Sequence, residues 1–127
     1  MAADLTNVGF EELKTPEQVD KAFAAPGTVL CMVNSVCGCA AGAARPGVKK
    51  SIAAGKHPGK LTTVFAGVDT DAVMQARQHF LPYPPSSPSI ALFKDGKLVH
   101  FVERHHIEGR TADMISEHLK MVFEEFC

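Results

Sequence analysis

The sequence predicts an α/β fold in which a mixed four-stranded sheet is flanked by helices on both faces. Stretches of strand length and of helical periodicity alternate along the chain, and Asp95-Gly96 is a two-residue hairpin signal between the last two strands. The hydrophobic fraction of 46% is enough for a packed core. With 127 residues, the chain is expected to form a single domain over residues 1–127.

The first half of the chain predicts a helix, a buried strand and a second helix. Residues 15–18 (TPEQ) match a helix start with a capping box and a proline at the first helical position. Residues 28–34 (TVLCMVN) form a continuous apolar run, which is typical of a strand buried on both faces. The Ala-rich residues 38–54 predict a helix that ends at Gly55 and is kinked by Pro46.

The second half of the chain predicts a strand, a helix, a hairpin and a final helix. The strand begins at residue 60 or 61 and ends at 66, and a helix that is capped by Asp69 or Thr70 and runs to about Phe80 follows. Residues 89–93 and 98–103 predict the two antiparallel hairpin strands. Thr111 caps the final helix. Its predicted apolar stripe consists of Met114, Ile115, Leu119, Val122, Phe123 and Phe126.

The predicted order of elements is α-β-α-β-α-β-β-α. The first two strands are joined through a helix, so they should be parallel neighbours in a right-handed crossover, whereas the last two form a hairpin. A mixed sheet with helices on both faces follows. This is the architecture of the thioredoxin fold.

Charge and hydropathy argue against several classes of function. Lys and Arg total 13 against 14 Asp and Glu, so the net charge of −1 creates no basic field for nucleic acid or an anionic membrane. No apolar run approaches the roughly 20 residues that cross a bilayer. Residues 1–7 lack the basic start and apolar stretch of a secretory signal. We therefore expect a cytoplasmic protein, whose thiols are mostly reduced.

Cys37-Gly38-Cys39 lies at the predicted junction between the buried strand and the following helix. Free N–H groups at a helix N-terminus stabilise a thiolate, so the pKa of Cys37 is expected to lie below the free value of about 8.5. Cys37 is the predicted attacking nucleophile, and Cys39 is the predicted resolving thiol. A disulfide across one residue is strained, although Gly38 relieves part of the strain. The motif therefore favours exchange or isomerase-like chemistry over strong reduction.

Residues on both sides of the pair are candidates for substrate contacts. Asn34 and Ser35 precede the motif and can supply polar contacts to a thiolate. Arg45 would either attract an anionic thiol or lie on the surface as a solvated charge, and both interpretations are open. Ser87-Pro88 lies where thioredoxin folds place a cis-proline before the third core strand, which would let the Ser87 backbone pair with substrate. An ordinary trans proline is the alternative.

Two interpretations other than catalysis apply to Cys37 and Cys39. They could be small packed residues on an Ala-rich helix, or two thiolates of a soft-metal site. Zinc needs four ligands, and the six histidines have no ligand-like spacing to the pair, so no metal is predicted. Cys31 is expected to pack in the core, and Cys127 is expected to be an incidental thiol at a mobile end. His105-His106, between two glutamates, is interpreted as part of a solvated loop.

Residues 33–42 (VNSVCGCAAG) resemble the active-site segment of the bacilliredoxins. The same resemblance is carried by residues 63–67, 85–89, 100–105 and 107–109, and it extends from about Gly9 to Cys127. It implies a thioredoxin-like fold and the removal of bacillithiol from mixed disulfides on proteins. It also implies that Cys37 attacks, that Cys39 corresponds to the second cysteine of the family motif, and that Ser87-Pro88 corresponds to the family's Ser-Pro.

The resemblance implies S-thiolated cytoplasmic proteins and a low-molecular-weight thiol as partners. The small thiol, bacillithiol or a similar compound, would be a co-substrate, and no metal or organic cofactor is expected beyond it. A protein disulfide isomerase that acts directly on protein disulfides is the first alternative. A metal-binding module built on the CxC motif is the second.

Overall fold

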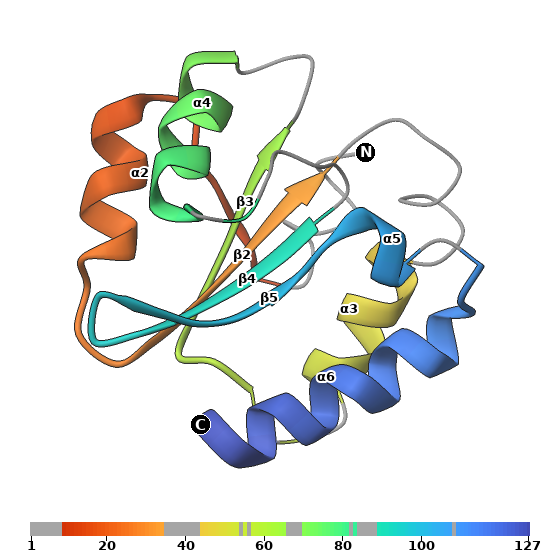
Figure 1. Ribbon diagram of the computed structural model, residues 1–127. Coiled ribbons are helices and arrows are strands. Elements are labelled where there is room, and N and C mark those ends of the chain that lie inside the picture. The colour runs from red at the N-terminus through yellow and green to blue at the C-terminus, as the bar shows by residue number, and fades with distance from the viewer. Residues whose placement is uncertain are drawn as a thin grey trace.

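The computed structural model describes residues 9–34, 44–53, 55, 57–65, 70–81, 83, 89–107 and 109–127. Its mixed sheet contains five strands in the order β1-β3-β2-β4-β5 (Figure 1). The strands are β1 Glu11–Glu12, β2 Thr28–Asn34, β3 Lys60–Phe65, β4 Ser89–Lys94 and β5 Lys97–Val102. The central strand β2 is parallel to β3 and antiparallel to β4, as the order of elements predicts.

The short edge strand β1 corrects the predicted four-stranded sheet. It pairs in parallel with β3, and the residue directly after it extends the attachment, since the Leu13 N–H donates to the Thr63 carbonyl at 2.8 Å. Two glutamates carry no apolar alternation, so the sequence gives no strand signal here. The flanking residues hold β1 in place, because Phe10 packs into the core on one face of the sheet and Leu13 into the core on the other.

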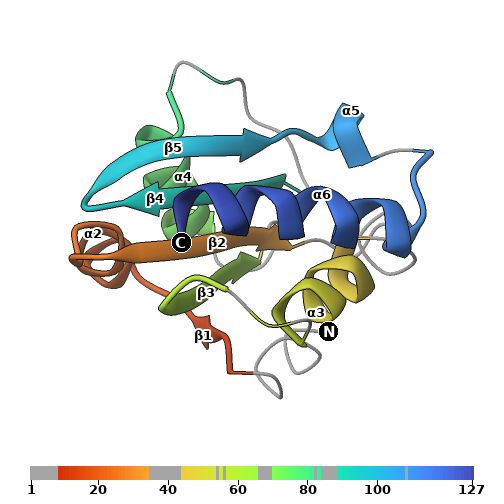
Figure 2. The same ribbon diagram turned by 90° about the horizontal axis from the view of Figure 1, so that it is seen from below.

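Helices cover both faces of the sheet, as predicted (Figure 2). One face carries α2 (Pro16–Phe23) and α4 (Thr70–His79), and the other carries α3 (Arg45–Ala53) and α6 (Ala112–Phe126). A single turn, α5 (Arg104–Ile107), follows β5 and was not predicted. Among the described residues, no helix combines the length and the apolar character needed to span a bilayer.

Local sequence signals set several element ends where they were predicted. The Thr15 hydroxyl accepts from the Gln18 N–H at 3.2 Å and the Gln18 side chain accepts from the Thr15 N–H at 3.3 Å, which completes the capping box. Thr111 caps α6 by accepting from the Met114 N–H at 3.2 Å. Asp95 and Gly96 adopt φ values of 53° and 82°, as a two-residue hairpin turn requires.

The helix predicted over residues 38–54 is described from Arg45 to Ala53. Its predicted first part, residues 38–43, lies outside the described residues. Pro46 is the second residue of α3 as described, where a missing N–H removes no intrahelical hydrogen bond of the described helix. Gly55, just beyond the helix, has the positive φ of 139° expected of a glycine that ends it.

Candidate active site at the carboxyl end of β2

Two chain segments with predicted functional residues meet the same edge of the sheet. The chain leaves β2 at Asn34 and enters α3 at Arg45, so the Cys37-Gly38-Cys39 motif belongs to the connection between them. Ser87-Pro88 directly precedes β4, whose first residue, Ser89, pairs with Val33 next to the end of β2. The six predicted site residues in these connections lie outside the described residues: Ser35, Cys37, Gly38, Cys39, Ser87 and Pro88.

Asn34 and Arg45 are the two predicted site residues that the structure describes, and it brings them together. The Arg45 Nη1 donates to the Asn34 Oδ1 at 2.9 Å, and both residues are buried. A hydrogen bond to a charged group stabilises a fold by about 1.5–3 kcal/mol. This bond joins the end of the central strand to α3, across the connection that contains Cys37.

The burial of Arg45 decides one of the alternatives left by the sequence. Only 5% of the residue is exposed, so the interpretation of Arg45 as a solvated surface charge is wrong. Long cationic side chains are almost never fully buried unless they are paired, and Arg45 has the Asn34 side chain as a partner. Its positive charge is fixed beside the connection that carries the CGC motif.

The two described cysteines are not candidates for the reactive thiol. Cys31 is fully buried in β2, and burial raises its pKa to about 12, which confirms its predicted place in the core. Cys127 is half-buried, and its N–H donates to the Phe123 carbonyl at 2.9 Å as the C-cap of α6. The C-terminal cysteine therefore packs against the core, contrary to the predicted mobile end.

The apolar stripe of α6 is confirmed in part. Ile115, Leu119, Val122 and Phe123 are buried against the sheet and α3. Met114 is 50% exposed, so its predicted place in the core is wrong. Met114 instead lines a pocket that also includes His106, which the sequence had assigned to a solvated loop. The sequence missed this pocket because its residues come from several elements, β4, β5, α5 and α6, that meet only in the folded chain.

Comparison with known proteins decides the family. Residues 1–127 match the family model described as disulphide isomerase. A bacilliredoxin of Cytophaga hutchinsonii is 66% identical over 125 residues, which cover 98% of this chain and 93% of that protein. The chain belongs to the bacilliredoxin family. A bacilliredoxin of Bacillus cereus is 53% identical over 124 residues, which cover 98% of this chain and 86% of that protein. The expectation drawn from the CGC segment and its accompanying motifs is confirmed, and the chain is a thiol-disulfide oxidoreductase of the bacilliredoxin type.

Solved structures show the same fold. The thioredoxin-like domain of Arabidopsis NCP matches with a TM-score of 0.62 at 21% identity, covering 91% of this chain and 77% of that one. A variant thioredoxin from Halobacterium salinarum matches with a TM-score of 0.61 at 16% identity, covering 91% of this chain and 88% of that one. The thioredoxin-like fold predicted for this bacilliredoxin-family chain is therefore confirmed.

Proposed function

We propose that this chain removes bacillithiol, or a similar low-molecular-weight thiol, from mixed disulfides on cytoplasmic proteins, with Cys37 as the nucleophile. The observation that carries the proposal is the place of the CGC motif in the fold. The motif lies in the connection between the central strand β2 and α3, in a chain of the bacilliredoxin family. Connections at the carboxyl ends of strands are where open α/β sheets bind their ligands.

The proposed reaction is two successive thiol–disulfide exchanges. The Cys37 thiolate attacks the bacillithiol sulfur of the mixed disulfide, a new S–S bond forms, and the target protein leaves as a thiolate that takes a proton from water. Cys37 then carries bacillithiol. Either a second bacillithiol thiolate attacks that sulfur and leaves with it as bacillithiol disulfide, which regenerates the Cys37 thiolate, or Cys39 attacks Cys37 and releases bacillithiol. The second route leaves a Cys37–Cys39 disulfide, which further thiols must reduce before the next cycle. Each exchange needs only thiols, so no metal or organic cofactor is required.

The described residues support the first exchange in two ways. The hydrogen bond between Asn34 and Arg45 fixes the strand and the helix on either side of the connection, which limits the positions that Cys37 can take. The buried Arg45 guanidinium also supplies positive charge, which favours a thiolate over a thiol nearby. Ser35, Gly38 and Ser87-Pro88 complete the proposed substrate contacts on the same edge of the sheet.

A protein disulfide isomerase is the second candidate, because the matching family model is described as a disulphide isomerase. In that reaction Cys37 attacks a protein disulfide directly and is displaced by another thiol of the same protein. An isomerase should restore a scrambled protein substrate without any added small thiol. The proposed de-thiolase instead needs a substrate that carries the small thiol.

The test is a de-thiolation assay on a bacillithiolated protein with reduced bacillithiol present. Cys37→Ser should abolish release of bacillithiol, whereas Cys39→Ser should retain much of it, because free bacillithiol can replace the resolving thiol. Cys127→Ser is the matched control and should leave the rate unchanged, since Cys127 packs at the far end of α6. Full activity in Cys37→Ser would overturn the proposal.

A further inference from the structure

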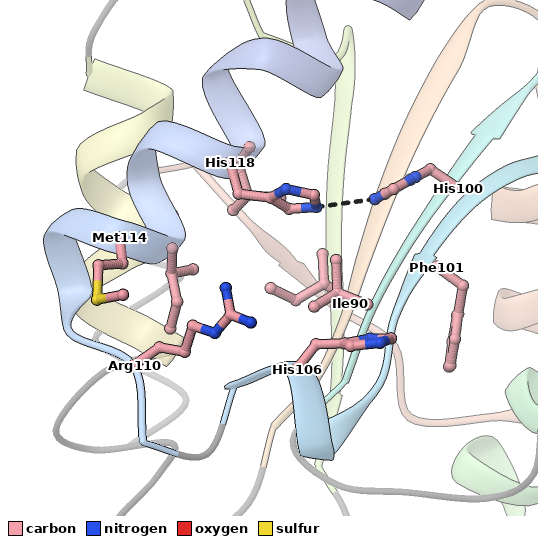
Figure 3. A pocket seen from close by; sticks show the side chains of 10 residues that line it. Ile90, His100, Phe101, His106, Arg110, Met114 and His118 are labelled. Atoms are coloured by element: carbon pink, nitrogen blue, oxygen red, sulfur yellow. Dashed lines mark hydrogen bonds between the residues drawn. The ribbon is translucent and has the colours of Figure 1, made fainter.

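A pocket of about 310 Å³ lies between β5, α5 and α6 (Figure 3). Five of the residues that line it are apolar and buried: Ile90, Phe101, Val102, Ile115 and Leu119. The volume lies at the lower end of the range of about 300–1,000 Å³ that is typical of small-molecule sites. The pocket can therefore hold a compact ligand with an apolar part.

The polar groups of the pocket are nitrogen bases and cations. His100 and His118 point toward one another, and their Nε2 atoms lie 3.0 Å apart in a hydrogen bond (Figure 3). His106 and Arg110 also line the pocket, and the Arg110 guanidinium points into the space beside His118 (Figure 3). Among the described lining residues none is a carboxylate, so the site offers hydrogen-bond donors and positive charge to a ligand.

Burial and neighbouring charges both disfavour the protonated forms of the histidine pair. Burial, and then the charge of His118, lower the pKa of His100; the Glu125 carboxylate raises it, and His106 lowers it by a smaller effect. Burial lowers the pKa of His118 as well, followed by the charges of Arg110 and His106. Arg110 is thus the permanent positive charge among the described lining residues, and any charge that a histidine gains is opposed by its neighbours. A bound anion would relieve this repulsion, whereas a bound cation would add to it.

A metal ion fits these residues less well than an anion. Within the part of the chain that the structure describes, no group of three or more His, Cys, Asp or Glu side chains could hold a metal. A zinc ion bound by His100 and His118 would lack two of its four usual ligands. It would also lie beside the permanently charged Arg110.

We propose that this pocket binds a small organic carboxylate. Its apolar body would pack against Ile90 and Leu119, and its oxygens would accept hydrogen bonds from His100, His118 and Arg110. The hydrogen bond between the two imidazoles then gives way, because both Nε2 atoms donate to the ligand. The negative charge of the carboxylate favours the protonated pair, in which both Nε2 atoms carry a hydrogen, so binding takes up a proton and is tighter at lower pH.

The position of the pocket gives the carboxylate two possible sources. Ile90 pairs with Met32 in β2 and with Val102 in β5, and it follows Ser89 at the edge of the sheet where the candidate active site lies. The carboxylate could belong to the small thiol itself or to a separate metabolite. The inference does not depend on the proposed function, because none of the pocket residues takes part in the exchange at Cys37.

The test uses hexanoate as the probe and hexanol as its uncharged counterpart, with the histidine ring signals followed by NMR. Hexanoate should shift the signals of His100 and His118 and raise both of their pKa values, whereas hexanol should not. For each proton taken up, affinity should fall by up to about tenfold per pH unit as pH rises between the free and bound pKa values. Equal effects of hexanoate and hexanol, or no shift with either, would overturn the proposal.

Two variants test whether hexanoate binds through the groups of the pocket and not through a general attraction to positive charge on the protein surface. Arg110→Gln should weaken hexanoate binding several-fold, and His118→Gln should reduce its dependence on pH. Lys97→Gln removes a positive charge from the exposed hairpin and is the matched control, which should bind hexanoate as the natural chain does. Unchanged binding in Arg110→Gln with an intact NMR spectrum, or zinc sulfate binding in preference to hexanoate, would contradict the proposal.

Bacillithiol disulfide distinguishes the two sources of the carboxylate. If it displaces bound hexanoate, the pocket receives the carboxylate of the small thiol, and the proposal is supported with that ligand. If hexanoate stays bound while Cys37 still exchanges with the disulfide, the proposal is supported with a separate metabolite. A failed de-thiolation assay would not change either hexanoate result. The proposed function and the proposed carboxylate site can therefore be refuted independently of each other.

Discussion

Gly47 lies where α3 packs against α6, and its replacement by alanine is expected to destabilise the fold. A Cβ atom added at Gly47 would lie 2.8 Å from both Cβ and Cγ2 of Ile115 and 3.0 Å from the carbonyl oxygen of Ala112. Carbon atoms in contact normally lie about 3.5–4.0 Å apart. Neither the Ile115 Cβ nor a backbone oxygen can rotate away, so the two helices must move apart.

Two effects of opposite sign determine the magnitude. Alanine is the better helix former by about 0.8–1.0 kcal/mol in a helix interior, which favours the variant. Forcing extra atoms into a well-packed core costs about 1–3 kcal/mol, which opposes it. The clash involves backbone and the stem of a buried side chain, so we take the upper part of that range. The expected net loss in the free energy of unfolding is about 1–2 kcal/mol.

Urea unfolding followed by circular dichroism measures this loss. Gly59→Ala is the matched control, because a Cβ atom there would meet only the Thr28 carbonyl oxygen at the ordinary distance of 3.8 Å. The control should be neutral or more stable by about 0.4–1 kcal/mol, since alanine restricts the unfolded chain. A free energy of unfolding for Gly47→Ala equal to or above that of the natural chain would refute the reasoning.

Three further predictions concern buried or hydrogen-bonded side chains. Asn34→Ala removes an acceptor of the buried Arg45 guanidinium and should lower the free energy of unfolding in urea by about 1.5–3 kcal/mol; a loss below about 0.5 kcal/mol would contradict this. The hydrogen bond with His79, and then that with Gln75, lowers the pKa of Asp20, so this carboxylate stabilises the fold above its unfolded pKa of about 3.9. That stabilisation is lost as pH falls through the lower folded pKa. The free energy of unfolding of Asp20→Asn, measured in urea, should therefore fall less steeply in acid than that of the natural chain. An unchanged dependence on pH would contradict this role of Asp20. Cys31 is 0% exposed, and burial raises its pKa to about 12. Iodoacetamide should therefore label it only when urea unfolds the chain, which mass spectrometry can measure. Labelling of Cys31 in the folded chain would contradict its burial.

The elements with strong local signals could be predicted from the sequence, whereas those held by tertiary contacts could not. The capping box at the start of α2, the apolar run of β2 and the Asp95-Gly96 turn each specify structure within a few residues. The strand β1 and the single turn α5 have no such signal. Both are attached through buried neighbours, and Ile107 of α5 is only 1% exposed. Contacts with the core therefore hold these two elements, in place of a local sequence signal.

The same distinction explains which part of the candidate site was predictable. The chemistry of Cys37 and Cys39 lies in three consecutive residues, so the sequence shows the motif and its place after a strand. The bond between Asn34 and Arg45 joins residues 11 apart, and the His100–His118 pair joins residues 18 apart on different elements. Each pair joins two different elements, so neither contact follows from the periodicity of a single helix or strand, and both appear only once the elements are packed.

Packing also connects the two sites physically. Arg45 is carried by α3 and His118 by α6, and the two helices meet at Gly47 and Ile115. Ile115 lies in that contact and lines the histidine pocket as well. Any movement that changes the distance between α3 and α6 must therefore shift either the buried arginine beside the CGC connection or the wall of the pocket. The absence of a side chain at residue 47 permits the close approach of the two helices that carry Arg45 and His118.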